Sequence, residues 1–281
     1  MAAKVESLAR ALALLTAFVL CEYGDLRAQT ADLVDRSALR VCADPANLPF
    51  SNKKREGFEN KLAELLGEKL GVPVLYTWFP QAMGFVRNTL RARKCDIIMG
   101  FSQGHELVQN TNHYYRSTYV MIVPAASPLK DVEHIGDARL KGRRIGVVAG
   151  TPPATLLALN DLLETARPFQ LMVDRRFESP AEKMVEEIVS GALDAGLLWG
   201  PIGGYYAKKS KTPLAVVPLT KEKQGPRMAY RITFGVRLNE KEWKRQLNRL
   251  IAKHQDEIHG LLLGYGVPLL DEQNTLVARG K

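Results

Sequence analysis

Residues 96–100, Asp-Ile-Ile-Met-Gly, decide the fold. The run is short and apolar at its centre, which is typical of a parallel strand covered by helices on both faces. Two further strand patterns precede it at 39–43 and 72–79, and helical patterns lie between the strands at 56–70 and 84–93. The sequence therefore predicts a β-α-β-α-β series that begins near residue 39.

The same pattern starts again at residues 144–148, Arg-Ile-Gly-Val-Val. Helical and strand patterns then alternate, with helices expected at 152–163, 180–190 and 202–208 and strands at 169–173, 194–199 and 214–217. The chain closes with a return strand at 230–236 and one long basic helix at 240–263. A second series of this kind indicates a second α/β unit.

Two stretches connect these series. An apolar strand at 119–123 follows a loop expected at 101–118 and leads to a first crossing near 120–126, and the polar segment 218–230 makes a second. We therefore predict an α/β protein of two lobes, each a mostly parallel sheet flanked by helices, joined by a double-crossover hinge. The expected boundaries are 29–122 plus 229–281 for lobe 1 and 123–228 for lobe 2.

Composition agrees with a globular protein. The chain has 281 residues, 46% of them apolar, and 25% are charged, which excludes disordered and low-complexity classes. Lys and Arg exceed Asp and Glu by 39 to 30, and this formal charge of +9 favours acidic partners or surfaces.

The N-terminal residues are typical of an export signal. Lys4 and Arg10 precede an uncharged run at 11–20, which is too short to span a bilayer but suits a secretory signal. We expect residues 1–28 to be removed after Ala28. The lipoprotein alternative through Cys21 is weaker, because Leu20 stands where a small residue is wanted. The mature chain is thus expected in the periplasm, without membrane insertion and without a nucleic-acid partner.

Export leaves two cysteines, Cys42 and Cys95, in an oxidising compartment. A disulfide between them would stabilise the fold by about 4 kcal/mol in the chain-entropy model. The alternative is two small buried residues on separate strands. Their spacing does not fit a zinc site.

The candidate site lies at the carboxyl ends of the predicted strands, where ligands bind in open parallel sheets. Five loops should converge there: 44–50, 78–80, 101–105, 150–155 and 199–204. The residues expected to line the cleft are Asp44, Phe50, Trp78, Phe79, Phe101, His105, Thr151 and Trp199. The aromatic side chains would make the cleft apolar and broad, although such rings also pack in cores. Thr151 could present backbone N–H groups to an anion or simply cap a helix.

Catalytic motifs are missing from the sequence. The five histidines lack metalloprotease spacing, and no serine stands in a Gly-x-Ser-x-Gly motif. His105 beside Glu106 is the only pair at the cleft that could do acid–base work. We therefore expect no catalysis, no metal site and no cofactor of its own.

The order of strands, helices and crossings resembles the type II periplasmic solute-binding fold, in the branch that binds polar amino acids. Gly57-Phe58-Glu59 before the first helix and Cys95-Asp96-Ile97-Ile98 are among its echoes. That branch grips its ligand with an arginine after the third strand and an aspartate five residues beyond an Asp-Ala pair. Here residues 101–115 contain no arginine, and the second position is Trp199. Free amino acids are therefore poor ligands for this chain.

Three stretches resemble the J-protein family of bacterial methanol-oxidation systems: 42–52, 76–81 together with 84–90, and 109–119. The resemblance implies an accessory or maturation role toward a quinoprotein methanol dehydrogenase that carries pyrroloquinoline quinone (PQQ) with calcium or a lanthanide, and it leans to the lanthanide type. The implied partners are the dehydrogenase and its c-type cytochrome. The rival hypothesis is a solute-binding protein that carries a small molecule, such as a quinone cofactor, to a transporter.

Overall fold

The structure, a computed structural model, describes residues 32–277. The expected export signal at residues 1–28 lies outside this part of the chain. Within residues 32–277, no helix has the length and apolar character needed to cross a membrane.

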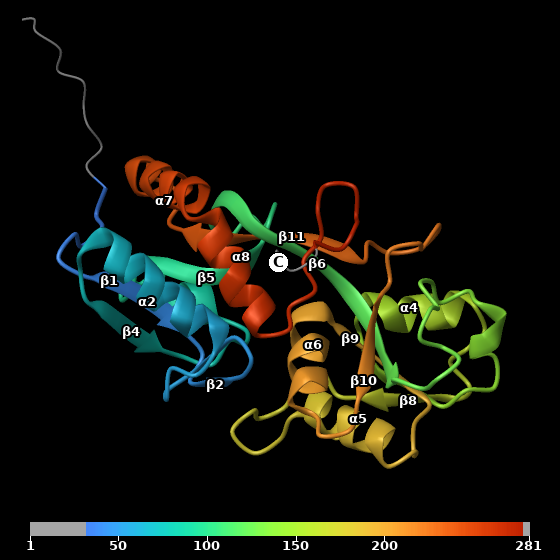
Figure 1. Cartoon of the computed structure of the whole chain (residues 1–281). Coiled ribbons are helices and arrows are strands. Elements are labelled where there is room, and N and C mark those ends of the chain that lie inside the picture. The colour runs from blue at the N-terminus through green and yellow to red at the C-terminus, as the bar shows by residue number, and fades with distance from the viewer. Residues whose placement is uncertain (1–31, 278–281) are drawn as a thin grey trace, which may run out of the picture. The chain divides into compact units, whose positions relative to one another are not determined.

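One mixed sheet organises the described part of the chain (Figure 1). Its strands are β1 (Leu39–Ala43), β4 (Val74–Trp78), β5 (Ile97–Ser102), β6 (Gln109–Pro124), β7 (Ile145–Val148), β8 (Ala166–Phe169), β9 (Ala195–Trp199), β10 (Leu214–Pro218) and β11 (Ala229–Val236). They follow the order β4-β1-β5-β11-β6-β9-β7-β8, and β10 also pairs with β6. The two predicted series are seen as two parallel groups, β4-β1-β5 and β9-β7-β8, with β6 and β11 antiparallel between them.

Helices cover this sheet in two groups. They are α2 (Phe58–Leu70), α3 (Phe85–Asn88), α4 (Pro152–Leu159), α5 (Pro180–Val189), α6 (Gly200–Lys209), α7 (Lys241–Lys253) and α8 (Gln255–Gly264), with a short 3-10 turn η1 (Ala138–Leu140). We call lobe 1 the part built on β1, β4, β5, β11, α2, α3, α7 and α8, and lobe 2 the part built on β7–β10 and α4–α6. The predicted two-lobed α/β fold is confirmed.

Strand β6 belongs to both lobes. Its first half pairs with β11, and its second half pairs with β9 and β10. In the second half, Met121 and Val123 enter one apolar core of lobe 2 while Val120 and Ile122 enter another. This alternation places the two cores on opposite faces of the sheet. The lobe boundaries expected after residues 122 and 228 stay a prediction, because β6 continues through the first of them.

Lobe 1 is held together by α2, which buries Phe58, Leu62 and Leu66 against the sheet. The helix begins after Gly57, whose N–H donates to Asn60 Oδ1 at 3.2 Å. A Cβ at Gly57 would lie 2.0 Å from the carbonyl oxygen of Phe50, so only glycine lets the 45–56 loop approach the helix this closely. This contact fixes the loop that forms one wall of the site described below.

The prediction of a loop at 101–118 is wrong for most of its length, because β6 begins at Gln109. The stretch looks like a loop because it is polar. In the structure β11 satisfies these polar groups: Asn110 Nδ2 donates to Thr233 Oγ1 at 2.8 Å, and Thr111 Oγ1 accepts from the N–H of Phe234 at 2.9 Å. A buried strand can therefore carry hydroxyls and amides when its neighbour provides partners.

The prediction of a single helix at 240–263 is also wrong. The chain leaves helical geometry at His254, with φ −119° and ψ 24°, and divides into α7 and α8. Buried Ile251 and Ile258 are seven residues apart, which is also the spacing of an unbroken helix, so periodicity gave no sign of the break. After the break, Gln255 Nε2 donates to the carbonyl oxygen of Tyr114 at 2.8 Å. This bond joins the start of α8 to β6.

Candidate functional site

A cavity of about 540 Å³ lies between the two lobes. Lobe 1 contributes one wall, the 45–56 loop that contains the short pair β2 (Ala46–Asn47) and β3 (Ser51–Asn52). Lobe 2 contributes the ends of β7 and β9, the start of α5, part of α6 and the loop 170–179. Its volume is in the range of pockets that hold a small organic ligand or several side chains.

Trp199 forms the centre of the apolar lining. It ends β9 and caps the start of α6, which places its ring beside both lobes. The ring centroid lies 5.3 Å from that of Tyr119 and 5.7 Å from that of Tyr230, with steep interplanar angles. Edge-to-face packing of this kind holds an aromatic ring in one orientation. The position that carries an aspartate in the amino-acid-binding branch is thus filled by a braced indole.

Phenols and aliphatic side chains surround the indole. Burial raises the pKa of Tyr119 to about 12, so its hydroxyl stays neutral. The Tyr206 hydroxyl lies 3.0 Å from Ser179 Oγ, and burial raises the pKa of Tyr206 also. Leu48, Leu171 and Ile202 are among the aliphatic residues of the lining. We call floor the part of the lining made by Trp199, Tyr119, Tyr206, Leu48 and Ile202. The floor can contact apolar groups and form hydrogen bonds through neutral hydroxyls.

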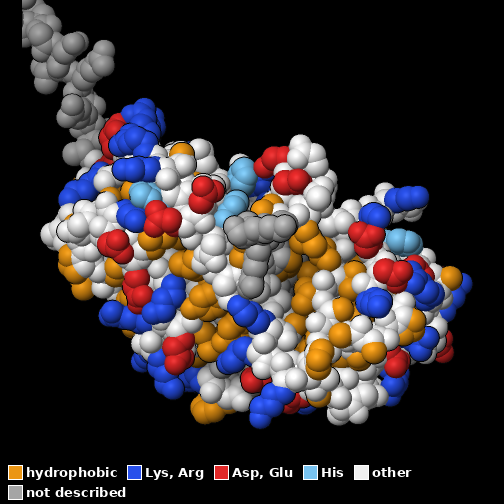
Figure 2. All heavy atoms as spheres, viewed as in Figure 1, with side chains coloured by type: hydrophobic (Ala, Val, Ile, Leu, Met, Phe, Trp, Pro, Cys, Tyr) orange, Lys and Arg blue, Asp and Glu red, His pale blue; other side chains and the backbone are white. Residues whose placement is uncertain are grey.

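Charged groups stand among the lining residues as well. Lys53, Lys54, Arg175 and Arg176 line the cavity together with Glu56 and Glu178, and all six are exposed. Figure 2 shows Lys or Arg side chains intermixed with hydrophobic ones between the positions that β2 and α6 have in Figure 1. The site therefore combines an apolar floor with a mouth in which cations outnumber carboxylates by four to two.

Two of the eight residues expected at the cleft, Thr151 and Trp199, line this cavity. Thr151 is the N-cap of α4, and its hydroxyl donates to the carbonyl oxygen of Val148 at 2.6 Å. That bond tightens the turn between β7 and α4. The hydroxyl is therefore already used within the protein.

Three other expected residues belong to the structure of lobe 1 and lie outside the cavity lining. The Asp44 carboxylate accepts from the N–H groups of Ala46, at 2.8 Å, and Gln81, at 2.6 Å. The Phe50 ring packs 5.2 Å from Phe58. The Trp78 ring stacks on Tyr76 at 4.6 Å. Asp44 thereby ties two loops together, and the two rings face neighbouring side chains.

The last three expected residues, Phe79, Phe101 and His105, also lie outside the lining. Phe79 and Phe101 pack against the apolar cluster around the two cysteines. The exposed His105 ring meets Phe101 edge-on at 5.0 Å. His105 and Glu106 therefore sit on the surface of lobe 1, away from the cavity between the lobes.

Cys42 and Cys95 are joined by a disulfide, with their Cα atoms 5.4 Å apart. The bond connects β1 to the turn before β5 beside Phe85, Val86 and Leu90. It therefore links the first strand of lobe 1 to the segment between α3 and β5.

Sequence reasoning missed the loop 170–179, which forms the lobe 2 lip of the cavity. A strand was expected at 169–173, but β8 ends at Phe169. Beyond it Leu171, Met172 and Phe177 are 46%, 65% and 84% exposed. Apolar residues followed by Asp174-Arg175-Arg176, without continuing alternation, were the available sign of a surface loop.

The geometry offers little for catalysis or metal binding. In the described part, no group of three or more His, Cys, Asp or Glu side chains could hold a metal ion. A braced indole, neutral phenols and exposed cations are groups that bind. The arrangement can therefore bind apolar and acidic groups between the two lobes.

Comparison with known proteins identifies the family. Residues 39–259 match the model of the bacterial extracellular solute-binding proteins, family 3. The chain belongs to this family. Solute-binding proteins of known structure share its fold, among them an ancestral cationic amino acid solute-binding protein, which is 25% identical, covers 82% of this chain and 96% of its own, and has a TM-score of 0.62.

Within this solute-binding family, the expected likeness to J proteins is confirmed. Protein MoxJ of Methylorubrum extorquens is 29% identical over 88% of this chain and 87% of its own length. The crystal structure of the periplasmic binding protein XoxJ from Methylobacterium extorquens is 39% identical, covers 83% of this chain and 100% of its own, and has a TM-score of 0.71. MxaJ from Methlophaga aminisulfidivorans, with the same coverage, is 28% identical with a TM-score of 0.70. The higher identity with XoxJ agrees with the expected lean toward that type.

Proposed function

We propose that this protein is a periplasmic accessory protein of a PQQ-dependent methanol dehydrogenase system, leaning to the lanthanide type. It binds the dehydrogenase through the cavity between the lobes and supports its activation. The resemblance to XoxJ and MoxJ supports the link to this system. The c-type cytochrome of the system is a further partner under this proposal, and the chain itself has no catalytic role.

The observation that carries the proposal is the aromatic centre of the cavity. Trp199 packs against Tyr119 and Tyr230. It stands where the resemblance to the amino-acid-binding branch implies an aspartate for the ligand's ammonium group. A buried zwitterion needs charge-assisted hydrogen bonds, each worth about 1.5–3 kcal/mol, and an indole ring supplies none to its ammonium group. An apolar side chain of a protein partner fits the same floor through area burial.

Contacts between lobe 2 and the end of α8 support a cavity of fixed width. Tyr205 of α6 stacks on Tyr265 with centroids 6.2 Å apart, and Lys208 Nζ donates to the carbonyl oxygen of Gly264. The Tyr265 hydroxyl in turn donates to the carbonyl oxygen of Glu56 at 2.8 Å. A protein that traps a small molecule closes by a hinge movement, which these contacts would resist. A docking site for a polypeptide needs no such movement.

The second candidate function is carriage of a small molecule to a transporter. One observation favours it: a cavity of about 540 Å³ that combines aromatic rings with Lys53, Lys54 and Arg175 could hold a planar polycarboxylate such as a quinone cofactor. Under this hypothesis the ligand itself, without any protein, stabilises the fold.

Binding of purified apo-dehydrogenase separates the two candidates. We expect a complex in analytical ultracentrifugation and a loss of affinity of about tenfold or more in the variant Leu171→Asp, which places a charge on the apolar lip. The control is Leu163→Asp, since Leu163 is similarly exposed, at 49% against 46%, and lies outside the lining. Both variants must melt within a few degrees of the unmodified protein.

Thermal melting with PQQ alone tests the carrier. A ligand present at 100 times its Kd adds about 2.7 kcal/mol to the free energy of unfolding. Stabilisation by PQQ with no binding of the dehydrogenase would refute the proposal and establish the second candidate. Equal binding of the dehydrogenase by both Leu171→Asp and Leu163→Asp would refute the cavity as the docking site.

A further inference from the structure

Among the residues that the structure describes, three cations at the mouth of the cavity form no ion pair. Lys53 and Lys54 extend from the lobe 1 wall and Arg175 from the lobe 2 lip. All three are exposed, and within residues 32–277 none of them forms an ion pair. Cationic side chains on both sides of one opening create a positive potential there, which the two lining carboxylates, Glu56 and Glu178, reduce only in part.

The neighbouring charges are used differently. Arg176 pairs with Asp174 at 2.5 Å, and the Arg55 guanidinium lies 5.2 Å from the centre of the Tyr76 ring. Glu56 Oε2 accepts from Asn52 Nδ2 at 2.7 Å, within its own loop. Glu178 is the other lining carboxylate. With Arg176 neutralised by Asp174, three cations face two carboxylates at the mouth, and the potential remains positive.

The cations stand around an apolar floor that includes Leu48, Trp199 and Ile202, with Leu171 on the lobe 2 lip. An occupant that satisfies both parts must carry apolar side chains for the floor and negative charge for the mouth. A typical protein–protein interface has buried apolar anchor residues at its centre and a polar rim around them. A free metabolite bound on the floor would have to contact Lys53 and Lys54 on the lobe 1 wall and Arg175 on the lobe 2 lip at the same time.

We propose that the segment bound in this cavity is an acidic stretch of polypeptide, with apolar residues against Trp199 and Asp or Glu residues against Lys53, Lys54 and Arg175. This inference rests on the proposed function and specifies the chemistry of the partner's segment. The exposed cations act on the association rate and on selectivity, because charges in solvent attract an acidic segment and repel a basic one. The apolar floor supplies most of the affinity.

The test uses purified apo-dehydrogenase and two synthetic twelve-residue peptides that share leucine positions, one with Glu and the other with Lys at every remaining position. The variant Lys53→Glu/Lys54→Glu/Arg175→Glu reverses the three cations. The control variant Lys141→Glu/Arg249→Glu/Lys253→Glu makes the same change of net charge at exposed positions outside the cavity lining. Circular dichroism melting checks that both variants fold.

We expect the cleft variant to lose about tenfold or more in affinity for the dehydrogenase and for the Glu peptide at low salt, and the control to change by less than about threefold. The affinity of the unmodified protein should fall as salt rises from 20 to 200 mM, with a smaller fall in the cleft variant. The Lys peptide should bind at least about tenfold more weakly than the Glu peptide.

Several results would overturn the inference. One is equal binding of the Glu and Lys peptides, and another is equal loss in the cleft and control variants. Tight binding of PQQ, of a DNA duplex or of anionic lipid vesicles that is lost in the cleft variant, with no binding of either peptide, would also overturn it. If Leu171→Asp weakens dehydrogenase binding and the charge reversal does not, the proposed function stands and this inference alone is wrong.

Discussion

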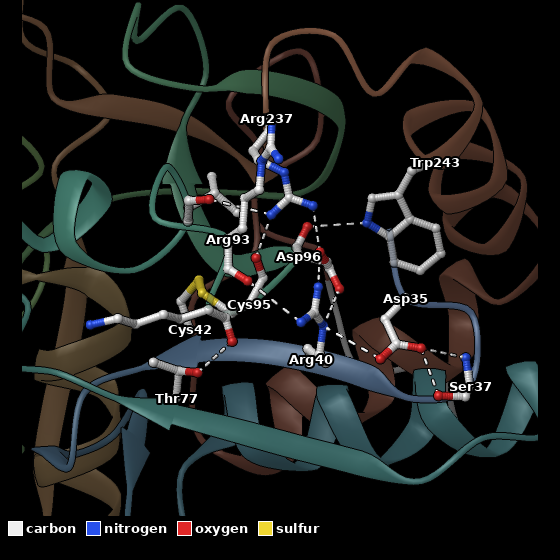
Figure 3. A network of polar contacts seen from close by, with 12 residues as sticks. Asp35, Ser37, Arg40, Cys42, Thr77, Arg93, Cys95, Asp96, Arg237 and Trp243 are labelled. Atoms are coloured by element: carbon white, nitrogen blue, oxygen red, sulfur yellow. Dashed lines mark hydrogen bonds and ion pairs between the residues drawn. A yellow bond between two sulfur atoms is a disulfide. The ribbon is translucent and has the colours of Figure 1, made fainter. Parts of the chain in front are cut away.

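Asp96 accepts two hydrogen bonds from Arg40, at 2.6 Å from Nε to Oδ2 and at 2.8 Å from Nη2 to Oδ1 (Figure 3). Arg237, after β11, donates to the same carboxylate, and Trp243 Nε1 of α7 donates to the Asp96 carbonyl oxygen at 3.2 Å. The Asp96 side chain is only 1% exposed. These donors therefore replace water around a buried charge and connect β1, β5, β11 and α7.

Removal of this carboxylate should destabilise the protein strongly. In Asp96→Ala the guanidinium groups of Arg40 and Arg237 stay largely buried without their shared anion. Loss of one partner from a buried ion pair costs about 3–5 kcal/mol. Urea unfolding followed by circular dichroism measures the loss.

Lobe 2 contains the matched control. The N–H of Asp194 donates to the carbonyl oxygen of Arg144 at 2.9 Å, as that of Asp96 does to Arg40 at 2.8 Å. Arg144 also holds the pKa of the Asp194 carboxyl below its usual value. The side chains of Arg144 and Asp194 are 55% and 27% exposed, so we expect Asp194→Ala to cost only about 1 kcal/mol. Losses of equal size in the two variants would contradict this account of burial.

The Cys42–Cys95 disulfide should contribute a separate share of stability. It links positions 53 residues apart, and closure of a loop of that length stabilises the native state by about 4 kcal/mol in the chain-entropy model. The double variant Cys42→Ala/Cys95→Ala should unfold at a lower urea concentration, with no further change on adding reductant. If reductant leaves the unfolding of the unmodified protein unchanged, the bridge contributes no stability.

Glu59 makes stability depend on pH. Burial, with a smaller contribution from the charge of Asp44, raises the pKa of this carboxyl from 4.5 to about 8. Between these values the folded protein keeps a proton that the unfolded chain has released. The bound proton thus stabilises the folded state fully below the pKa of the unfolded chain, 4.5. This stabilisation is lost as pH rises from 4.5 to about 8, by up to about 1.4 kcal/mol for each pH unit.

The variant Glu59→Gln carries a neutral group at every pH. We expect its free energy of unfolding to decline less steeply than that of the unmodified protein between pH 5 and pH 8. Glu68→Gln is the control, because Glu68 lies on the same helix with its side chain 75% exposed. Parallel stability curves for the unmodified protein and Glu59→Gln would show that Glu59 is ionised throughout.

The sequence predicted those strands whose burial shows in their composition. Residues 96–100 and 144–148 are apolar because helices cover both faces, and both were found as β5 and β7 within two residues at each end. The first half of β6 was missed because the hydrogen-bonding partners of its polar residues lie on β11, more than a hundred residues away. Local pattern carries no information about such a distant partner.

The site was predictable to a similar degree. Loops at the carboxyl ends of strands did lead to Trp199 and Thr151, since that rule follows from topology. It does not determine where a side chain points: Phe50 lies in one of the expected loops but packs on Phe58. More than a hundred residues separate Lys53 and Lys54 from Arg175 in the sequence, and only the three-dimensional approach of the two lobes brings these cations to one opening.

The close approach of α6 to the segment after α8 leads to a last prediction. A Cβ at Gly204 would lie 1.9 Å from the carbonyl oxygen of Gly266, so Gly204→Ala must push this helix away from the segment. Overpacking of this kind costs about 1–3 kcal/mol. By contrast, a Cβ at Gly260 in α8 meets no atom within 4 Å, and Gly260→Ala should stabilise by about 0.5–1 kcal/mol through helix propensity.

The two substitutions are chemically identical, so opposite signs in urea unfolding would isolate the effect of contact. Because α6 also carries Ile202 and Tyr206 into the cavity, the displacement in Gly204→Ala should move that wall and weaken binding of the dehydrogenase, while Gly260→Ala should leave binding unchanged. Stabilisation by Gly204→Ala equal to that by Gly260→Ala would mean that α6 and the 264–268 segment separate readily. The cavity would then have no fixed width, and hinge closure around a small ligand would become the better account.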